Sequence, residues 1–147
     1  MRTQIFERTS RFLNAMEAAD VKVLASMLDE DIIWSAPMSA SGGQEVETVQ
    51  GLDAFGARLM EIGGLMQSAK FADRRITVSA DGATSFVQSN GEFVTTDGRP
   101  YRNVYVFRFD WVDDKIVAWE EYANPVTIVK TFPEQYGHLL DDVPSGP

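Results

Sequence analysis

One carboxylate interrupts an apolar side of a predicted strand near the C-terminus. Over residues 115–123 alternate side chains face opposite sides of a strand, so Val117, Trp119 and Glu121 share one face. Burying a carboxylate beside apolar side chains costs several kcal/mol or raises its pKa. A carboxyl group with a pKa near neutrality can give or take a proton, which makes Glu121 a candidate general acid or base. The alternative is a carboxylate at the sheet rim, solvated or paired with a cation.

Polar and aromatic side chains elsewhere complete the candidate site. Tyr105 and Asn103 lie on one face of the preceding strand, where they either bind a carbonyl or hydroxyl oxygen or simply pack within the sheet. Three aromatic side chains are predicted to surround the site and contribute to raising the pKa of Glu121, namely Trp119, Trp34 and Phe12.

Gln88 and Asn90 join this site only if their strand is continuous. The pair Asn90-Gly91 is a two-residue turn signal, so the chain either reverses there or continues with a bulge at Gly91, which we favour because the flanking runs are short. With a continuous strand, Gln88 and Asn90 are predicted to be polar pocket residues; with a turn, both assignments fail.

The longest alternating run, residues 99–125, predicts two antiparallel strands that reverse at Asp113-Asp114. Two further strands are predicted at residues 71–78 and 84–96, separated by Asp81-Gly82. Apolar residues at helical spacing predict helices at residues 3–19, at 21–28 with Asp20 as the N-cap, and from Leu52 to Met66, where Gly63-Gly64 should end or fray the helix. A short strand at residues 32–38 lies between the second and third helices, and a brief helix is expected at residues 126–132.

Two segments show no periodic pattern. Residues 39–51 are polar and glycine-rich and predict a loop, of a length that often forms a lid. Residues 133–147 predict a loose tail, which holds the single histidine, His138. A lone histidine in a tail is not expected to be catalytic, although its side chain can titrate near neutral pH.

Composition bounds the protein's class and partners. The 147 residues predict one domain, residues 1–147, with a core that needs no disulfide, and the chain has no cysteine. A formal charge of −9 argues against nucleic acid and anionic membranes as partners. No His, Asp and Glu cluster has metal-ligand spacing, no Gly-Lys-Ser/Thr motif cradles a phosphate, and the sequence predicts neither a metal nor a cofactor. With no apolar leader or membrane span, a cytoplasmic location is expected.

The separation of helices from a run of antiparallel strands predicts the α+β class. This order, the VQGLDAF step into the third helix and the run YRNVYVFRFDWVDDKIVAWEEYANP resemble the SnoaL-like and ketosteroid-isomerase-like branch of the nuclear transport factor two-like superfamily, over residues 5–132. The resemblance implies a cone, in which a curved antiparallel sheet wraps a long N-terminal helix and two further helices complete the fold. It also implies an apolar interior that binds a small molecule.

The catalytic residues of ketosteroid isomerases are absent from this chain. Where those enzymes place a Tyr on the first helix, this sequence has Phe12. Ala36 takes the place of their general-base Asp, and Tyr105 the place of their second Asp. Steroid isomerisation by that mechanism is therefore not expected.

Limonene-epoxide-hydrolase-like enzymes give one positive match. Their Trp-Arg-Asp-Tyr resembles residues 119–122, which puts Glu121 where they have a catalytic carboxylate. Their Tyr and Asn correspond to Trp34 and Ala36, and their Arg and second Asp fall near Gln88 and Asn90. These differences count against epoxide opening, which nevertheless remains an alternative activity.

Two functions follow from the resemblance. The first is a small enzyme, an isomerase, cyclase or epoxide-hydrolase-like protein, that acts on an apolar oxygen-containing molecule through Glu121. The second is a non-catalytic ligand-binding or dimerisation module of the same fold. The face opposite Tyr105 has Val104, Val106 and Ala118 between the charged residues Arg102, Arg108 and Glu120, a pattern that suits a homodimer interface through the sheet.

Overall fold

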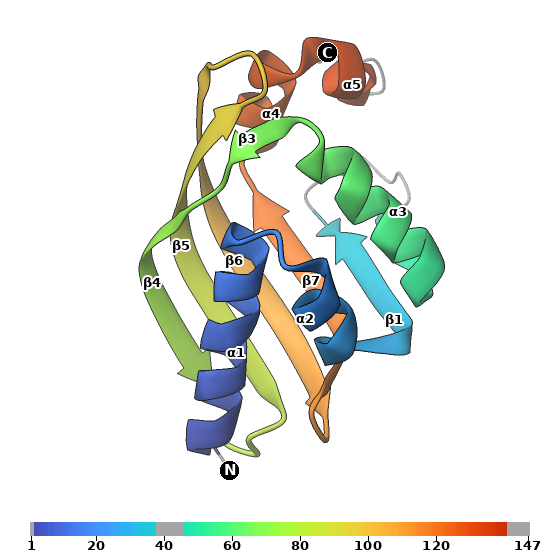
Figure 1. Cartoon of the computed structure of the whole chain (residues 1–147), viewed down its shortest axis with the longest axis vertical. Coiled ribbons are helices and arrows are strands. Elements are labelled where there is room, and N and C mark those ends of the chain that lie inside the picture. The colour runs from blue at the N-terminus through green and yellow to red at the C-terminus, as the bar shows by residue number, and fades with distance from the viewer. Residues whose placement is uncertain (1, 38–45, 141–147) are drawn as a thin grey trace, which may run out of the picture.

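The computed structural model describes residues 2–37 and 46–140, and in it three helices precede the main run of strands, as predicted (Figure 1). The helices are α1 (Arg2–Glu17), α2 (Val21–Met27), α3 (Leu52–Gly63), α4 (Pro125–Thr131) and α5 (Pro133–Tyr136), followed by the 3-10 turn η2 (Gly137–Leu140). The strands are β1 (Leu28–Ala36), β2 (Glu47–Gln50), β3 (Met66–Ser68), β4 (Phe71–Val78), β5 (Thr84–Thr95), β6 (Pro100–Val112) and β7 (Lys115–Ala123).

The strands form one large curved sheet that does not close into a barrel. Its order is β2-β1-β7-β6-β5-β3, and β4 also pairs with β5. Every pair is antiparallel except β1 with β7, which is parallel, so the predicted all-antiparallel sheet is corrected to a mixed one. Figure 1 shows α1 lying across the sheet over β4, β5 and β6, and α3 beside β1. The architecture is an α+β cone.

Helix α1 packs against the sheet through one apolar stripe. Ile5, Phe12 and Leu13 recur at helical spacing and are buried, while most charged residues of α1 lie on the exposed side. Asp20 caps α2 as predicted, since its side chain accepts a hydrogen bond from the Val23 amide at 3.1 Å. The long first helix therefore covers the concave face of the sheet.

Three boundaries differ from the sequence predictions. Helix α2 ends at Met27, and Leu28 instead begins β1, four residues before the expected start of that strand. The acidic residues 29–31 are accommodated where the pairing of β1 with β7 shifts register, between Leu28 and Ile33. Part of the predicted loop forms β2, which pairs with β1, while residues 39–45 of that loop lie outside the described residues. Helix α3 ends at Gly63, where Gly63-Gly64 were predicted to end or fray it, and Met66, predicted to belong to this helix, begins β3.

The hairpin of β6 and β7 follows the predicted alternation, with its reversal at Asp113-Asp114. The odd-numbered residues 101–111 of β6 are all buried and form much of the interior. One residue of β7 departs from the pattern. The register shifts between Asp110 and Trp111, so Ile116 pairs with Trp111 and is fully buried, whereas Val117, predicted to share the inner face, is only partly buried. The bulge moves Val117 out of that alternation.

Strand β5 runs through Asn90-Gly91 without turning and without the bulge predicted at Gly91. Its pairing with β6 is unbroken from Thr84 to Val94, with Gly91 opposite Asn103. The irregularity lies instead in the neighbouring strand β4, between Ala72 and Arg75, where Asp73 has a φ of 53°. A Cβ at Gly91 would lie 2.5 Å from Cε2 of Tyr105, so this glycine serves a close approach to an aromatic ring.

The chain after β7 is ordered into short helices. Asn124 caps α4 through a 3.0 Å hydrogen bond from the Val126 amide, and Pro125 occupies the first turn, in agreement with the predicted brief helix. Where a loose tail was predicted, α5 and η2 cover residues 133–140, and Tyr136 packs against Phe132 with ring centroids 6.3 Å apart. Residues 141–147 of that tail lie outside the described residues.

Candidate functional site

Glu121 lies on the inner face of the sheet. It pairs across the strands with Phe107, which is fully buried, and paired residues project to the same face. Its neighbour two residues earlier, Trp119, is 1% exposed. The structure therefore places Glu121 among apolar side chains, partly buried, and not on the outer face with Glu120 and Tyr122.

The three aromatic side chains predicted near Glu121 belong to one packed cluster that also contains Phe55. Trp119 makes edge-to-face contacts with Phe12 at 5.5 Å and with Phe55 at 5.3 Å between ring centroids. Trp34 pairs with Trp119 across the parallel strands β1 and β7 and stacks on Phe55 at 6.2 Å. Helices α1 and α3 thus each supply a ring that packs against Trp119.

This environment brings the pKa of Glu121 to about 7. Burial is the largest cause, because it removes water from the charged form, and the nearby carboxylate of Glu47 raises the pKa further. A hydrogen bond from Trp34 and the positive charge of Arg58 act in the opposite direction. At neutral pH the group is divided between its acid and its carboxylate, so it can both donate and accept a proton.

Four residues near Glu121 were not identified from the sequence. Arg58 of α3 donates to Glu47 of β2 at 2.8 Å and lies 5.8 Å from the ring centroid of Tyr136. The charge of Glu121 also raises the pKa of Tyr101 and of Tyr136, after burial as the largest cause for each phenol. Tyr101 lies on the same face of its strand as Tyr105, so the alternation of side chains could have identified it. No local sequence pattern connects Arg58, Glu47 and Tyr136.

Asn103 and Tyr105 are buried on the inner face, as their alternation predicted. The side-chain oxygen of Asn103 accepts from the backbone amides of Val104 at 2.8 Å and Asn124 at 2.9 Å. Its amide nitrogen donates to the Asn124 carbonyl at 3.2 Å and to the Tyr101 hydroxyl at 2.9 Å. Every donor and acceptor of the Asn103 side chain is therefore used within the protein. These hydrogen bonds join β6 to the residue that follows β7.

Gln88 and Asn90 do not belong to this site, and their prediction as pocket residues is wrong. They pair with Val106 and Val104 and are exposed on the outer face of the sheet. The inward side chains of this part of β5 are Ser85, Val87 and Ser89. Strand β5 is continuous, as the pocket hypothesis required, but the pocket hypothesis had the orientation of Gln88 and Asn90 reversed.

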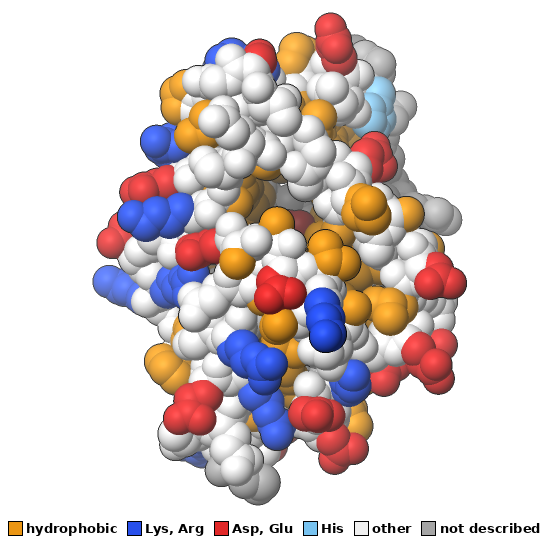
Figure 2. All heavy atoms as spheres, viewed as in Figure 1, with side chains coloured by type: hydrophobic (Ala, Val, Ile, Leu, Met, Phe, Trp, Pro, Cys, Tyr) orange, Lys and Arg blue, Asp and Glu red, His pale blue; other side chains and the backbone are white. Residues whose placement is uncertain are grey.

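A recess in the molecular surface opens towards this region. Figure 2 shows it in the middle of the face on which α1 and α3 lie, at the position where Figure 1 has the C-terminal end of β7. Hydrophobic side chains border it. Within residues 2–37 and 46–140 no group of three or more His, Asp or Glu side chains is placed to hold a metal ion. The lone histidine, His138, is exposed on η2.

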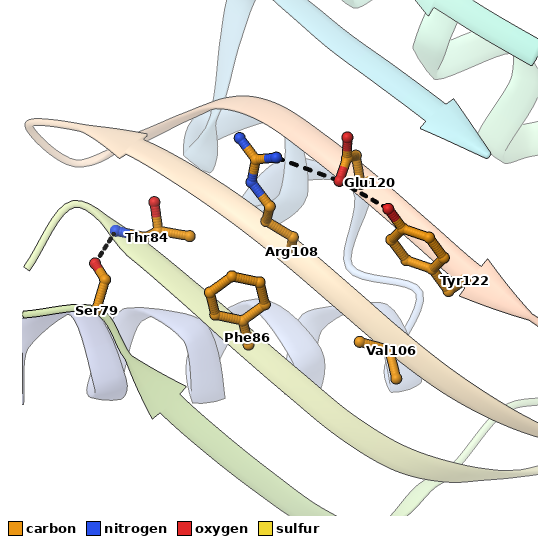
Figure 3. A pocket seen from close by; sticks show the side chains of 7 residues that line it. All are labelled: Ser79, Thr84, Phe86, Val106, Arg108, Glu120 and Tyr122. Carbon is orange, nitrogen blue, oxygen red and sulfur yellow. Dashed lines mark hydrogen bonds and ion pairs between the residues drawn. The ribbon is translucent and has the colours of Figure 1, made fainter. Parts of the chain in front are cut away.

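The outer face of the sheet has a separate shallow groove. Phe86, Val106 and Tyr122 line it together with the ion pair of Arg108 and Glu120, whose nearest atoms are 3.3 Å apart (Figure 3). Exposed apolar side chains continue along this face, since Val104 is 53% exposed and Phe86 42% exposed. Glu121 is not part of this groove.

None of the helices among the described residues is long and apolar enough to cross a membrane.

Comparison with known proteins agrees with the fold. A Bacillus subtilis (strain 168) protein called YesE, itself uncharacterised, is 24% identical over 128 residues, which cover 86% of this chain and 85% of that protein. A crystal structure of a Bacillus subtilis protein provisionally named an isomerase superposes with a TM-score of 0.77 at 21% identity, covering 90% of this chain and 96% of the other. A provisionally named polyketide cyclase from Pseudomonas putida KT2440 gives a TM-score of 0.68 at 20% identity, covering 86% and 96%.

The model of the SnoaL-like domain family matches residues 9–119, from the middle of α1 to the middle of β7. The chain therefore belongs to the SnoaL-like family, as its sequence resemblance indicated.

Proposed function

We propose that the protein is a cofactor-independent enzyme that moves a proton on an apolar oxygen-containing small molecule, with Glu121 as the acid or base. The observation that supports this is a carboxyl group on the inner face of the sheet, beside Phe107 and Trp34, with a pKa of about 7. Such a group can both donate and accept a proton at neutral pH. The names isomerase and polyketide cyclase given provisionally to similar structures agree with this class of chemistry.

The reaction begins with removal of a proton from carbon next to a carbonyl. The Glu121 carboxylate takes the proton, and the electron pair of the C–H bond moves to give an enolate. When the enolate is conjugated with a C=C bond, return of the proton at the far carbon gives an isomer. Attack of the enolate carbon on a second carbonyl instead closes a ring, and the alkoxide so formed takes the proton back from Glu121. Epoxide opening would instead use the protonated form of Glu121 as the acid.

Deuterium exchange tests this proposal without knowledge of the natural substrate. We expect the protein in deuterated water to catalyse exchange at the carbon next to the carbonyl of apolar ketones, because the carboxyl group returns a deuteron in place of the proton. The rate should rise with pH and level off above an apparent pKa of about 7. Mass spectrometry of a panel of ketones and epoxides gives the measurement. Exchange that is independent of pH between 5 and 9 would contradict a role for Glu121.

The second candidate is a non-catalytic ligand-binding or dimerisation module of the same fold. The dense packing of Phe12 and Phe55 against Trp119 favours it, because rings occupy space that a bound substrate would need. A panel in which apolar ligands bind but neither exchange nor turn over would support this function over the first. A cytoplasmic location accompanies either candidate and stays a prediction.

We also propose that the outer face of the sheet forms a homodimer interface, with its exposed valines and Phe86 at the centre and charged residues around them. Light scattering should give twice the chain mass of 16.4 kDa. Val106→Glu should yield the monomer, because it buries a charge in the interface. Met60→Glu is the control, since Met60 is 73% exposed on α3 and away from this face. A wild-type mass of one chain at all concentrations would refute the dimer.

A further inference from the structure

A row of three residues, Glu121, Ala36 and Glu47, crosses the inner face of the sheet. Strands β7 and β1 pair in parallel, with Glu120 beside Ser35. One residue further along both strands, Ala36 lies beside Glu121. On its other side Ala36 pairs with Glu47 of β2. Paired residues project to the same face of a sheet, so the two carboxylates lie on the inner face with only a methyl group between them in the row.

The spacing of this row allows the two carboxylates to act on each other. Neighbouring strands are about 4.8 Å apart, so the backbones of Glu121 and Glu47 are separated by roughly 10 Å. Both residues are partly buried, so water screens their charges incompletely. With an effective dielectric constant between those of protein and water, one charge at this distance changes the pKa of the other group by roughly 0.5 to 1. The carboxylate of Glu47 therefore disfavours ionisation of Glu121.

Helix α3 brings a positive charge to the same place. Phe55 of α3 stacks on Trp34 of β1, which places this helix against the inner face. Arg58 follows Phe55 by three residues and so projects from the same side of the helix. It donates to the Glu47 carboxylate at 2.8 Å. Arg58 therefore opposes the effect of Glu47 on Glu121.

The other titratable groups near Glu121 among the described residues carry no charge between pH 5 and 9 or lie in water. Its charge affects three phenols, namely Tyr101, Tyr105 and Tyr136. Burial raises the pKa of all three above the usual 10, so they stay neutral. Glu61 also contacts Arg58, at 3.4 Å, but its side chain is 67% exposed against 36% for Glu47. Strand β1 contributes no titratable side chain to this part of the face.

We propose that Glu47 and Arg58 are positioning residues that together set the pH at which Glu121 exchanges its proton. Both act through the charge state of Glu121, so neither needs to touch a substrate. The pKa of Glu121 agrees with the strand register, since burial is the largest cause of its value of about 7, Glu47 raises it and Arg58 lowers it. This deepens the proposed function and rests on it only for the use of the proton in a reaction; the titration requires no catalysis.

Carbon-13 NMR of protein labelled at its glutamate carboxyl groups measures the titration of Glu121 directly. The signal is assigned by its absence in Glu121→Gln and followed from pH 4 to 9, where wild type should show a midpoint of about 7. Glu47→Gln keeps the shape of the side chain and removes its negative charge, so the midpoint should fall by roughly 0.5 to 1. Arg58→Met should raise the midpoint by a similar amount, because it removes the cation and leaves the Glu47 carboxylate without this partner.

Three further variants separate charge from structure. Arg58→Lys keeps the positive charge and should have a midpoint closer to wild type than Arg58→Met. Glu61→Gln is the matched control, since Glu61 contacts the same arginine from an exposed position outside the row, and its midpoint should equal that of wild type. Combining Glu47→Gln with Arg58→Met should bring the midpoint back towards wild type, because the two shifts have opposite signs. Should Arg58→Met fail to fold, Glu47→Gln and Glu61→Gln still decide the test.

Deuterium exchange by the same proteins distinguishes this inference from the proposed function. Midpoints that move as expected, with the pH profile of exchange moving alongside them, would support both. Midpoints that move in a protein that catalyses no exchange would support this inference and count against the proposed function. An NMR midpoint that is the same in wild type, Glu47→Gln and Arg58→Met would overturn the inference, and exchange that persists would leave the proposed function intact. A shift in Glu61→Gln as large as that in Glu47→Gln would also overturn it, because position in the row would then not matter.

Discussion

Glu121→Gln is expected to slow deuterium exchange by roughly 10²- to 10⁴-fold, the usual contribution of a general acid or base. The amide of Gln has nearly the same shape as the carboxyl group and can still accept the hydrogen bond from Trp34, but it cannot take up a proton. Exchange rates of the purified variant and wild type, measured side by side at pH 8, give the comparison. An unchanged rate would contradict a proton-transfer role for Glu121.

The same substitution should change how stability depends on pH. The pKa of Glu121 rises from an ordinary 4.5 to about 7 on folding, so the folded protein keeps a proton that the unfolded chain loses. The stability contributed by the protonated group is fully present below pH 4.5 and is lost as pH rises through about 7. Between pH 4.5 and a pH above 7, the free energy of unfolding of wild type should therefore fall by at most about 3 kcal/mol more than that of Glu121→Gln.

Urea unfolding at pH 5, 6.5 and 8 measures this difference, with Glu120→Gln as the matched control. Glu120 is the adjacent carboxylate, on the outer face, where it contacts Arg108. We expect the gap between wild type and Glu121→Gln to widen with pH and the curve of Glu120→Gln to run parallel to wild type. Parallel curves for all three proteins would show that Glu121 is solvated, and would favour the carboxylate at the sheet rim.

Gly91→Ala is expected to destabilise the protein by roughly 1–3 kcal/mol. The new methyl group would lie 2.5 Å from Cε2 of Tyr105, whose ring is held between Phe93 and Phe107 with centroids 5.5 Å and 5.4 Å away. The ring must move, and its hydroxyl moves with it, so the 3.3 Å hydrogen bond between the hydroxyls of Tyr105 and Tyr101 should weaken as well. Thermal and urea unfolding give the loss of stability.

A double-mutant cycle isolates the steric cause. Once Tyr105→Ala has removed the ring, Gly91→Ala should cost nothing, because the methyl group then meets no ring atom. Gly56→Ala is a control with the opposite expected effect. No atom lies within 4 Å of the Cβ position of Gly56 in α3, so alanine should raise the free energy of unfolding by about 0.5–1 kcal/mol. An equal cost of Gly91→Ala with and without the Tyr105 ring would locate the strain in the backbone instead.

The sequence predicted most accurately where the pattern was long and local. The alternation over residues 99–125 gave the β6–β7 hairpin, its turn and the inner-face position of Glu121, because one face of each strand is buried and polar residues mark the other. Apolar stripes and the Asp20 cap likewise predicted α1 and α2, and the resemblance built on these elements gave the family.

Prediction failed where a distant contact decided the outcome. Asn90-Gly91 predicted a turn or a bulge, whereas the glycine is needed because the ring of Tyr105, on the neighbouring strand, approaches it closely. The orientation of β5 was misjudged because polar residues occur on both its faces, with Ser89 inside and Gln88 outside. The Arg58–Glu47 pair joins a helix to a strand inside a predicted loop, and Tyr136 comes from a predicted tail, so no spacing rule connects them.

The parallel pairing of β1 with β7 has a consequence for how the protein folds. Strands β5, β6 and β7 follow one another through short turns and can assemble early, whereas β1 reaches β7 only after most of the chain has been synthesised and looped back. Trp34 comes from β1 and Glu121 from β7. The hydrogen bond from Trp34 to Glu121 therefore depends on the contact of longest range in the sheet, and a partly folded meander of β5, β6 and β7 would lack it.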